Sequence, residues 1–178
     1  TPAIKRFLSE VKDGRVPQTL WTYKDVGHTQ EAKKSLLELV AFTDSDEVFD
    51  TPKPPRLISQ MLRLATTPND HDIVLDFFAG SGTTAQSVLE MNSEDGGNRR
   101  FILVQLPEET RSKNYPTIAH ITRERIHRVI AKLNSKEEGT LPLTIHQDRG
   151  FRAFTLSSSN FKIWNAGQSD AAPYSLAE

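Results

Sequence analysis

The chain has 178 residues, a formal net charge of −1 and no cysteine. Its length suits one domain with a real core, and 37% hydrophobic with 25% charged residues excludes a disordered chain. The small net charge gives no global electrostatic reason to bind nucleic acid. The lack of cysteine excludes disulfides and thiolate metal sites and fits a reducing cytosol. No apolar run approaches the ~20 residues that a membrane-spanning helix needs.

The first predicted element is a helix that follows a poorly periodic N-terminal stretch. Apolar residues fall at helical spacing from Ala32 to Val40, and Thr29 is the expected N-cap. An acidic loop then leads into TPKPPRLISQMLRLA, where two prolines open a helix with one apolar face. We therefore expect a flanking segment, 1–46, with one helix.

A strand, a glycine loop, a helix, a second strand and a long helix come next. The strands are expected at Ile73–Phe77 and Phe101–Leu106, the helix between them ends near Asn92, and Pro116 opens the last helix. This alternation predicts an α/β domain with a parallel sheet, which we place at residues 47–135.

The C-terminal region is expected to be less regular. RGFRAFTLSSSNFKIW predicts two short strands around a serine turn, as part of a β tail at residues 136–164. Residues 165–178 are small and polar, and we expect them to be disordered.

The long last helix carries a basic cluster of Arg123, Arg125, Arg128 and Lys132. This cluster either contacts DNA phosphate or a partner subunit, or forms a solvated face, and the intervening Glu124 favours the solvated face. No metal site is predicted, because the histidines lack metal-ligand spacing. They are His28, His71, His120, His127 and His146.

The stretch VLDFFAGSGTTAQ carries the strongest chemical signal. Gly80, Gly82 and Ala85 satisfy G-x-G-x-x-G/A between a predicted strand and a predicted helix. Glycine lets a ligand approach the backbone, and the N–H groups from Ser81 to Thr84 can face a carboxylate at the start of the helix. A phosphate-binding P-loop is excluded, because its lysine is absent. A tight turn without a ligand stays an alternative.

Asp76, at the tip of the first strand, favours one class of ligand. A carboxylate there repels a pyrophosphate, but it suits the α-ammonium group of S-adenosylmethionine, whose α-carboxylate can face the helix N–H groups. The charge pattern therefore prefers this methyl donor to a dinucleotide. Two alternatives stay open: an NAD(P)- or FAD-dependent oxidoreductase Rossmann domain, and a non-catalytic α/β interaction module.

Several motifs resemble one family. DFFAGSGTTA resembles the adenosylmethionine-binding motif of amino-group DNA methyltransferases, the N6-adenine and N4-cytosine enzymes, and TPKPPRLISQML resembles the segment before it in circularly ordered members. VGHTQEAKKSLLEL, NRRFILVQLPEE, ITRERIHRVI and GFRAFTLSSSNFKIW resemble the modification subunit of type III restriction–modification systems. The resemblance covers about Trp21 to Trp164. It implies a partial Rossmann-like S-adenosylmethionine-dependent methyltransferase fold, the donor-binding half of a mostly parallel sheet.

The resemblance also implies a set of S-adenosylmethionine-binding residues. Lys53 would pair with the carboxylate of the donor and Asp76 with its ammonium. Phe78 would help to wall the pocket, unless it belongs to the core, and Thr83 and Thr84 would cap the helix or bind the ligand. The full set is Thr51, Lys53, Pro54, Asp76, Phe77, Phe78, Ala79, Gly80, Ser81, Gly82, Thr83, Thr84 and Gln105.

Gln105 departs from the wider family, in which the second strand ends in an acid that binds the ribose hydroxyls. Its position, about 20 residues after the glycine loop, is that of a ribose-binding residue, and a glutamine can accept and donate without a charge. The type III modification subunits resemble this chain in having the glutamine. Either Gln105 or Glu108 is expected to contact the ribose.

The catalytic motif of the family, [DNS]-PP-[YFW], is missing. The one Pro-Pro pair, Pro54-Pro55, lies between Lys53 and Arg56 and does not match. We therefore expect a C-terminal piece of a circularly ordered adenine N6 methyltransferase that has no catalytic residue, is inactive alone and is prone to self-association. The resemblance implies a cytoplasmic, prokaryotic protein that acts on double-stranded DNA through the full-length subunit and pairs with a restriction subunit, with no membrane contact.

Overall fold

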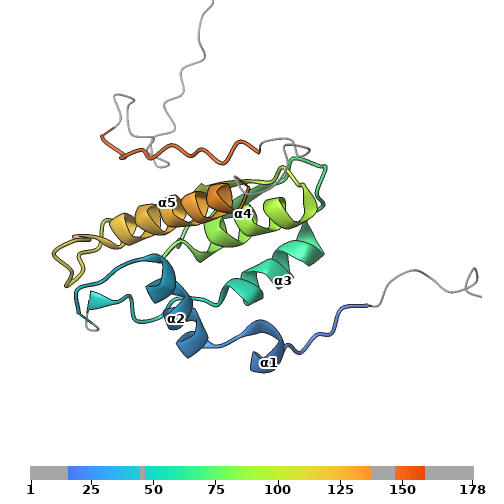
Figure 1. The fold of residues 1–178 in the computed structure, drawn as a ribbon, viewed down its shortest axis with the longest axis horizontal. Helices are drawn as coiled ribbons and strands as arrows, with labels where there is room; N and C mark the ends of the chain where they lie inside the picture. Colours follow the sequence, from blue (N-terminus) through green and yellow to red (C-terminus); the bar gives the residue numbers. More distant parts are fainter. Residues whose placement is uncertain (1–15, 45–46, 138–146, 159–178) are drawn as a thin grey trace, which may run out of the picture.

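The computed structural model describes part of the chain, namely residues 16–44, 47–137 and 147–158. In this part, three helices lie side by side, with α4 between α3 and α5 (Figure 1). The elements in chain order are α1 (Tyr23–Val26), α2 (Thr29–Leu39), α3 (Pro55–Ala65), β1 (Ile73–Asp76), α4 (Thr83–Asp95), β2 (Arg100–Leu103) and α5 (Ile118–Glu137).

The two strands form a parallel pair, in which Ile73 lies opposite Arg100 and Asp76 opposite Leu103. A parallel connection needs a crossover, and α4 provides it. The expected α/β class with a parallel sheet is therefore confirmed. Both strands are shorter than expected, because their regular pairing ends where β1 turns into the glycine loop after Asp76. The strand β2 also begins one residue earlier than expected.

One face of this sheet packs against the helices. Val74 and Phe101 contact a buried cluster of Leu62, Val88 and Met91, which come from α3 and α4. Phe101 also contacts a second cluster between α4 and α5. The helical spacing of the apolar residues in α3 thus gives that helix one face that can cover a strand.

The opposite face of the sheet is apolar and open to solvent in the described part of the chain. Ile73, Leu75 and Ile102 are 54%, 58% and 52% exposed. Parallel sheets normally have both faces covered, which is why their strands read as continuous apolar runs. The strands of this chain are therefore built for burial on two sides, and α3, α4 and α5 cover one of them.

The flanking segment contains two helices in its described part, and the expectation of one helix was wrong. The short helix α1 forms because the N–H and hydroxyl groups of Thr22 both donate to Asp25 Oδ2, which fixes the first turn. For α2, the N-cap is His28, whose Nδ1 accepts from the Glu31 N–H, and Thr29 is the first helical residue.

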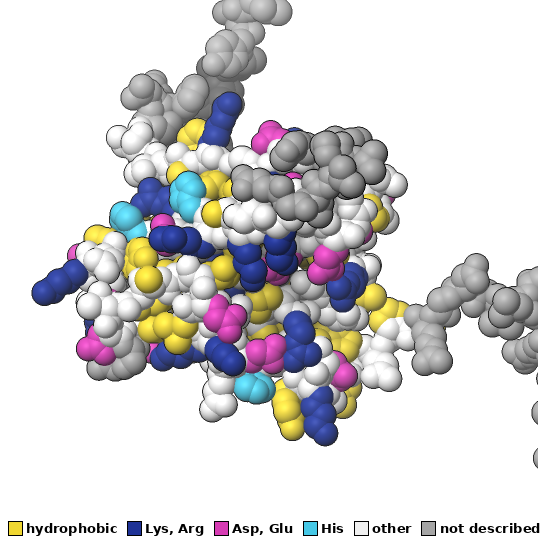
Figure 2. Space-filling view, viewed as in Figure 1, with side chains coloured by type: hydrophobic (Ala, Val, Ile, Leu, Met, Phe, Trp, Pro, Cys, Tyr) yellow, Lys and Arg dark blue, Asp and Glu magenta, His cyan; other side chains and the backbone are white. Residues whose placement is uncertain are grey.

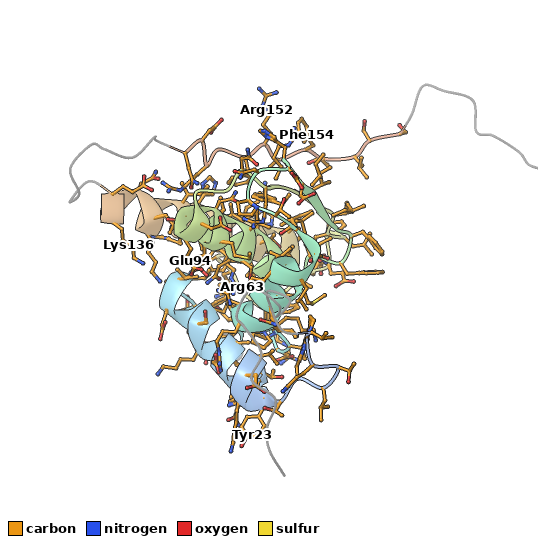
Figure 3. The ribbon with its side chains drawn as sticks, turned by 90° about the vertical axis from the view of Figure 1, so that its right-hand side faces the viewer. Tyr23, Arg63, Glu94, Lys136, Arg152 and Phe154 are labelled. Carbon is orange, nitrogen blue, oxygen red and sulfur yellow. The ribbon has the colours of Figure 1, made fainter. Side chains whose placement is uncertain are left out.

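Arg56 connects α3 to both of these helices. Its guanidinium donates to the two carboxylate oxygens of Glu31, each at 2.8 Å, and to the carbonyl oxygens of Lys24 and Asp25. At the other end of α3, Arg63 forms an exposed ion pair with Glu94 of α4 (Figure 3). Because Arg56 makes four bonds in a fixed fork, it is the stronger of the two connections.

The β tail expected at residues 136–164 has no strand in its described residues: 136–137 belong to α5, and 147–158 form neither helix nor strand. Residues 147–158 run along the helices (Figure 1) and pair with neither β1 nor β2. Phe151 packs into the cluster between α4 and α5, and Arg149 donates to Glu137 at the end of α5. Beyond this contact the side chains of Arg152 and Phe154 point away from the body (Figure 3). The rest of the predicted tail, and residues 165–178, lie outside the described residues.

The face shown in Figure 2 carries both acidic and basic side chains, in agreement with the small net charge, and several of the basic side chains lie close together near its middle. Among the described helices, none is long and apolar enough to cross a membrane.

Two glycines at the ends of α4 provide a matched test of packing. Gly82 (φ +81°) and Gly96 (φ +69°) both have left-handed backbones, but a Cβ on Gly82 would lie 3.0 Å from Thr122 Cγ2, whereas Gly96 has open space. We expect Gly96→Ala to lower the free energy of unfolding by about 1 kcal/mol and Gly82→Ala by a further 1–3 kcal/mol, roughly, from overpacking. Denaturant titration measures both, and equal losses would contradict the packing role of Gly82.

Candidate functional site

The candidate site lies at the carboxyl ends of β1 and β2, where the chain leaves both strands. Two backbone bonds extend the pairing past β2: the Val104 N–H donates to Asp76 O at 2.8 Å, and the Ala79 N–H donates to Val104 O at 3.1 Å. The glycine loop is therefore tied to the segment after β2. This brings Asp76, the loop and Gln105 to one edge of the sheet, which is where ligands bind in open α/β sheets.

Asp76 is half-buried, and both of its carboxylate oxygens are engaged. Oδ1 accepts from the Phe78 N–H at 3.0 Å, and Oδ2 accepts from the Thr84 hydroxyl at 2.6 Å. These two bonds fix the carboxylate at the strand tip between the loop and the first turn of α4. An ionised carboxylate has about four acceptor positions, so two remain for a ligand.

Gly80 is held by two side chains from distant elements. Its N–H donates to Gln105 Oε1 at 2.7 Å, and its carbonyl oxygen accepts from the Thr122 hydroxyl of α5 at 2.5 Å. Its φ of +53° is a left-handed conformation that glycine adopts without strain. Gln105, expected to contact a ribose, thus holds the loop with its carbonyl oxygen, which keeps a second lone pair.

Gly82 is the N-cap of α4, and it makes room for a helix. The position of its absent Cβ faces Thr122 of α5. Thr83 and Thr84, which were expected to cap α4 or bind a ligand, are not caps. They are the first two helical residues, and their hydroxyls donate to Lys53 O and to Asp76.

The proline segment, residues 49–55, lies against the glycine loop and the start of α4. Besides the bond from Thr83 to the Lys53 carbonyl, the Ser87 hydroxyl donates to Pro55 O at 3.2 Å, and a Cβ on Gly80 would lie 3.5 Å from the ring of Phe49. The Phe49 ring therefore lies beside the loop, and the carbonyls of Lys53 and Pro55 bond the first turns of α4. The side chains of Thr51 and Lys53 are exposed, and Pro54 is buried.

Phe77 and Phe78 follow the strand tip and are open to solvent. They are 61% and 81% exposed, and their ring centroids lie 5.1 Å apart. The alternative that Phe78 is a core residue was therefore wrong: the turn after Asp76 directs both rings outward. Ala79, the third residue of the expected wall, is buried.

Arg125 was interpreted as part of a solvated basic face, and this was wrong for that residue. It is fully buried beneath the glycine loop, where its guanidinium bonds Ser81, Thr83 and Gln86. Burial lowers the pKa of the guanidinium to about 10. The alternating charges around it gave no sign of this, since the packing of α4 on α5 decides which face is buried.

The site therefore combines one anionic group with several neutral donors. Asp76 supplies the anion, while the first-turn N–H groups of α4 and the exposed Lys53 favour an anion on the ligand. Exposed aromatic rings at Phe77 and Phe78 supply apolar surface. Within the described residues, no group of three or more His, Cys, Asp or Glu is placed to hold a metal ion.

Comparison with known proteins agrees with these features. The family model described as "DNA methylase", for N6 and N4 methyltransferases, matches residues 3–141. The chain is 39% identical over 142 residues to the type III restriction-modification enzyme StyLTI Mod subunit of Salmonella typhimurium, which covers 76% of this chain and 20% of that protein. It is 35% identical to the EcoPI Mod subunit of Escherichia phage P1, over 77% of this chain and 22% of that protein.

A further relative is the type II methyltransferase M.KpnI of Klebsiella pneumoniae, 35% identical over 57% of this chain and 22% of that protein. The chain thus spans about a fifth of the length of the curated relatives it matches. These matches do not favour an oxidoreductase. From the extent of the family match and the identity to the Mod subunits, the chain belongs to the N6/N4 DNA methylase family.

Proposed function

We propose that residues 47–135 are the S-adenosylmethionine-binding part of a DNA methyltransferase that acts on adenine N6 in a type III restriction–modification system. The observation that carries the proposal is the position of Asp76. Its carboxylate is fixed at the strand tip beside a glycine loop that has no phosphate-binding lysine. A fixed anion there attracts an ammonium and repels a diphosphate.

Each charged end of the donor has a counterpart in this site. Asp76 accepts from the α-ammonium group, and the first turn of α4 with Lys53 faces the α-carboxylate. Phe77 and Phe78 line the apolar part, and Gln105 contacts the ribose through the lone pair and amide hydrogen that its bonds to Gly80 and Leu106 leave unused. When bound, S-adenosylmethionine supplies the methyl group for transfer to the amino nitrogen of the base.

The chain does not supply the groups that act on the base. An exocyclic amine gives its lone pair to the ring, so acceptors must draw on its hydrogens before it attacks the methyl, and the base must be turned out of the helix. The sequence contains no [DNS]-PP-[YFW] tetrad for this purpose. The proposed role of the chain is therefore to hold the donor, while DNA contact, catalysis and pairing with a restriction subunit belong to a longer protein.

Titration of the 178-residue chain with S-adenosylmethionine, NAD and FAD tests the proposed function. We expect weak, saturable binding of S-adenosylmethionine in the calorimeter and no binding of either dinucleotide. The same chain should transfer no labelled methyl group to DNA. Binding of NAD or FAD without S-adenosylmethionine would support the oxidoreductase alternative, and binding of none would support the interaction module.

Asp76→Asn separates the charge of Asp76 from its structural bonds. The amide oxygen still accepts from the Phe78 N–H, and its NH₂ group can donate to the Thr84 hydroxyl, so the turn is kept while the anion is lost. We expect the Kd for S-adenosylmethionine to rise at least about tenfold, the loss of one charged hydrogen bond. Thr84→Val is the control, because it removes a bond to Asp76 but keeps the charge. An unchanged Kd in Asp76→Asn would refute the ammonium argument.

Self-association is proposed for the 178-residue chain through the exposed face of the sheet. Burial of Leu75 and Ile102 against a second copy would remove apolar area from water. Sedimentation velocity should show a concentration-dependent increase in mass that Leu75→Thr with Ile102→Thr reduces. Leu37→Thr is the control, because Leu37 is 48% exposed but lies on α2. A monomer at all concentrations would contradict the proposal.

A further inference from the structure

Arg125 occupies an unusual position for a charged side chain. It lies on α5, is 0% exposed, and bonds Ser81 of the glycine loop and Thr83, whose hydroxyl also donates to the Lys53 carbonyl of the proline segment. One turn earlier on the same helix, the Thr122 hydroxyl donates to Gly80 O, and its Cγ2 fills the space beside Gly82. The same face of α5 thus contacts the loop at Gly80, Ser81 and Gly82.

The guanidinium makes three close bonds, all to the loop and the first turn of α4. Nη1 donates to Ser81 Oγ and to Thr83 Oγ1, each at 2.9 Å, and Nε donates to Gln86 Oε1 at 2.7 Å. A longer bond, 3.4 Å, joins Nη1 to the Ser81 carbonyl. One rigid planar group therefore fixes Ser81 and Thr83 at the start of α4, the end of the helix to which the proposed function assigns the α-carboxylate of the donor.

The charge of Arg125 has no direct counter-ion in the described part of the chain. Each of its acceptors is a neutral oxygen, and Nη2 has no hydrogen-bond partner among the described residues. The acid that acts on it, Glu90, is reached through Gln86, whose Nε2 donates to Glu90 Oε1 at 3.0 Å. The guanidinium therefore leaves a net positive potential beneath the loop.

Stability of the fold alone does not account for a buried cation of this kind. Removal from water is costly unless a charge partner compensates it, and an apolar side chain of similar size often serves stability equally well. Its close bonds go to Ser81 of the glycine loop and to Thr83 and Gln86 in the first turn of α4, all next to the candidate site. This pattern is expected of a residue that prepares a site.

We propose that Arg125 is a positioning residue for the amino-acid end of the methyl donor: it holds Ser81 and Thr83 in the conformation that presents the first-turn N–H groups to the α-carboxylate. Its positive charge favours the same carboxylate through the loop. The inference rests on the proposed function, because it assumes that S-adenosylmethionine binds at this loop. It adds a residue on α5 that does not itself touch the ligand.

The test compares two ligands that differ at the amino-acid end. S-adenosylhomocysteine carries the α-ammonium and α-carboxylate groups, whereas 5′-methylthioadenosine lacks both and keeps the adenosine and the sulfur. In calorimetric titrations of the 178-residue chain, Arg125→Met should raise the Kd for S-adenosylhomocysteine by about tenfold or more. The Kd for 5′-methylthioadenosine should stay within about twofold. Arg125→Lys should lie between wild type and Arg125→Met, because it keeps the charge and loses the fork.

Arg99 provides a matched control. It is equally buried, at 4% exposed, and its guanidinium bonds Thr66, Asn92 and Asp95 at the other end of α4. Arg99→Lys should lower the free energy of unfolding, measured by denaturant titration, without changing the Kd of either ligand. If Arg125→Met fails to fold, Arg125→Lys replaces it in the test. Arg99→Lys then shows how much a purely structural loss alters the Kd.

The outcomes are distinct. Equal weakening of both ligands, or an effect of Arg125→Lys no larger than that of Arg99→Lys, would overturn the positioning role and leave Arg125 structural. A wild-type Kd for S-adenosylhomocysteine in both Arg125 variants would overturn it as well. Failure of the wild-type protein to bind any of these ligands or S-adenosylmethionine would refute the proposed function, and the inference with it.

Discussion

The parallel pairing of β1 with β2 is the constraint on which the candidate site depends. Because the strands run in the same direction, their carboxyl ends lie at one edge, and the two backbone bonds beyond β2 extend that edge to Val104. Asp76 and Gln105 come together for this reason alone, although 28 residues of helix, turn and strand separate them in the sequence. An antiparallel pair would have placed them at opposite ends.

The glycine loop is held by side chains from several elements rather than by its own turn. Gln105 accepts from the Gly80 N–H, Thr122 donates to the Gly80 carbonyl, and Arg125 bonds Ser81. Thr83 then joins the loop to the carbonyl of Lys53. Such preorganisation reduces the entropy that a ligand must remove on binding. It also explains why Gly82 is needed: its absent side chain lets α5 come close enough to make these bonds.

Much of this arrangement follows from the sequence. The apolar runs, the prolines before α3 and the glycines after β1 are local signals, and they placed the parallel pair and the loop correctly. Arg125 could not be found in this way, because its neighbours Arg123 and Glu124 are exposed or half-exposed and its own burial depends on α4. The segment around Phe151 has the composition of a strand, but the Phe151 side chain packs between α4 and α5 instead of the backbone pairing with the sheet. The bond from the Thr84 hydroxyl to Asp76 likewise depends on the tertiary structure, so the spacing of residues in the sequence could not predict it.

The two-stranded sheet in the described part of the chain has one further consequence. Each strand has only one neighbour, so the backbone bonds that carry Asp76 and Gln105 are those of an edge, where amide protection against solvent is low. A molecule that contacts both Asp76 and Gln105 would connect the carboxyl ends of the two strands. The local order of the sheet would then rise as more of the site is occupied by ligand, so the rigidity of this edge depends on the ligand as well as on the protein.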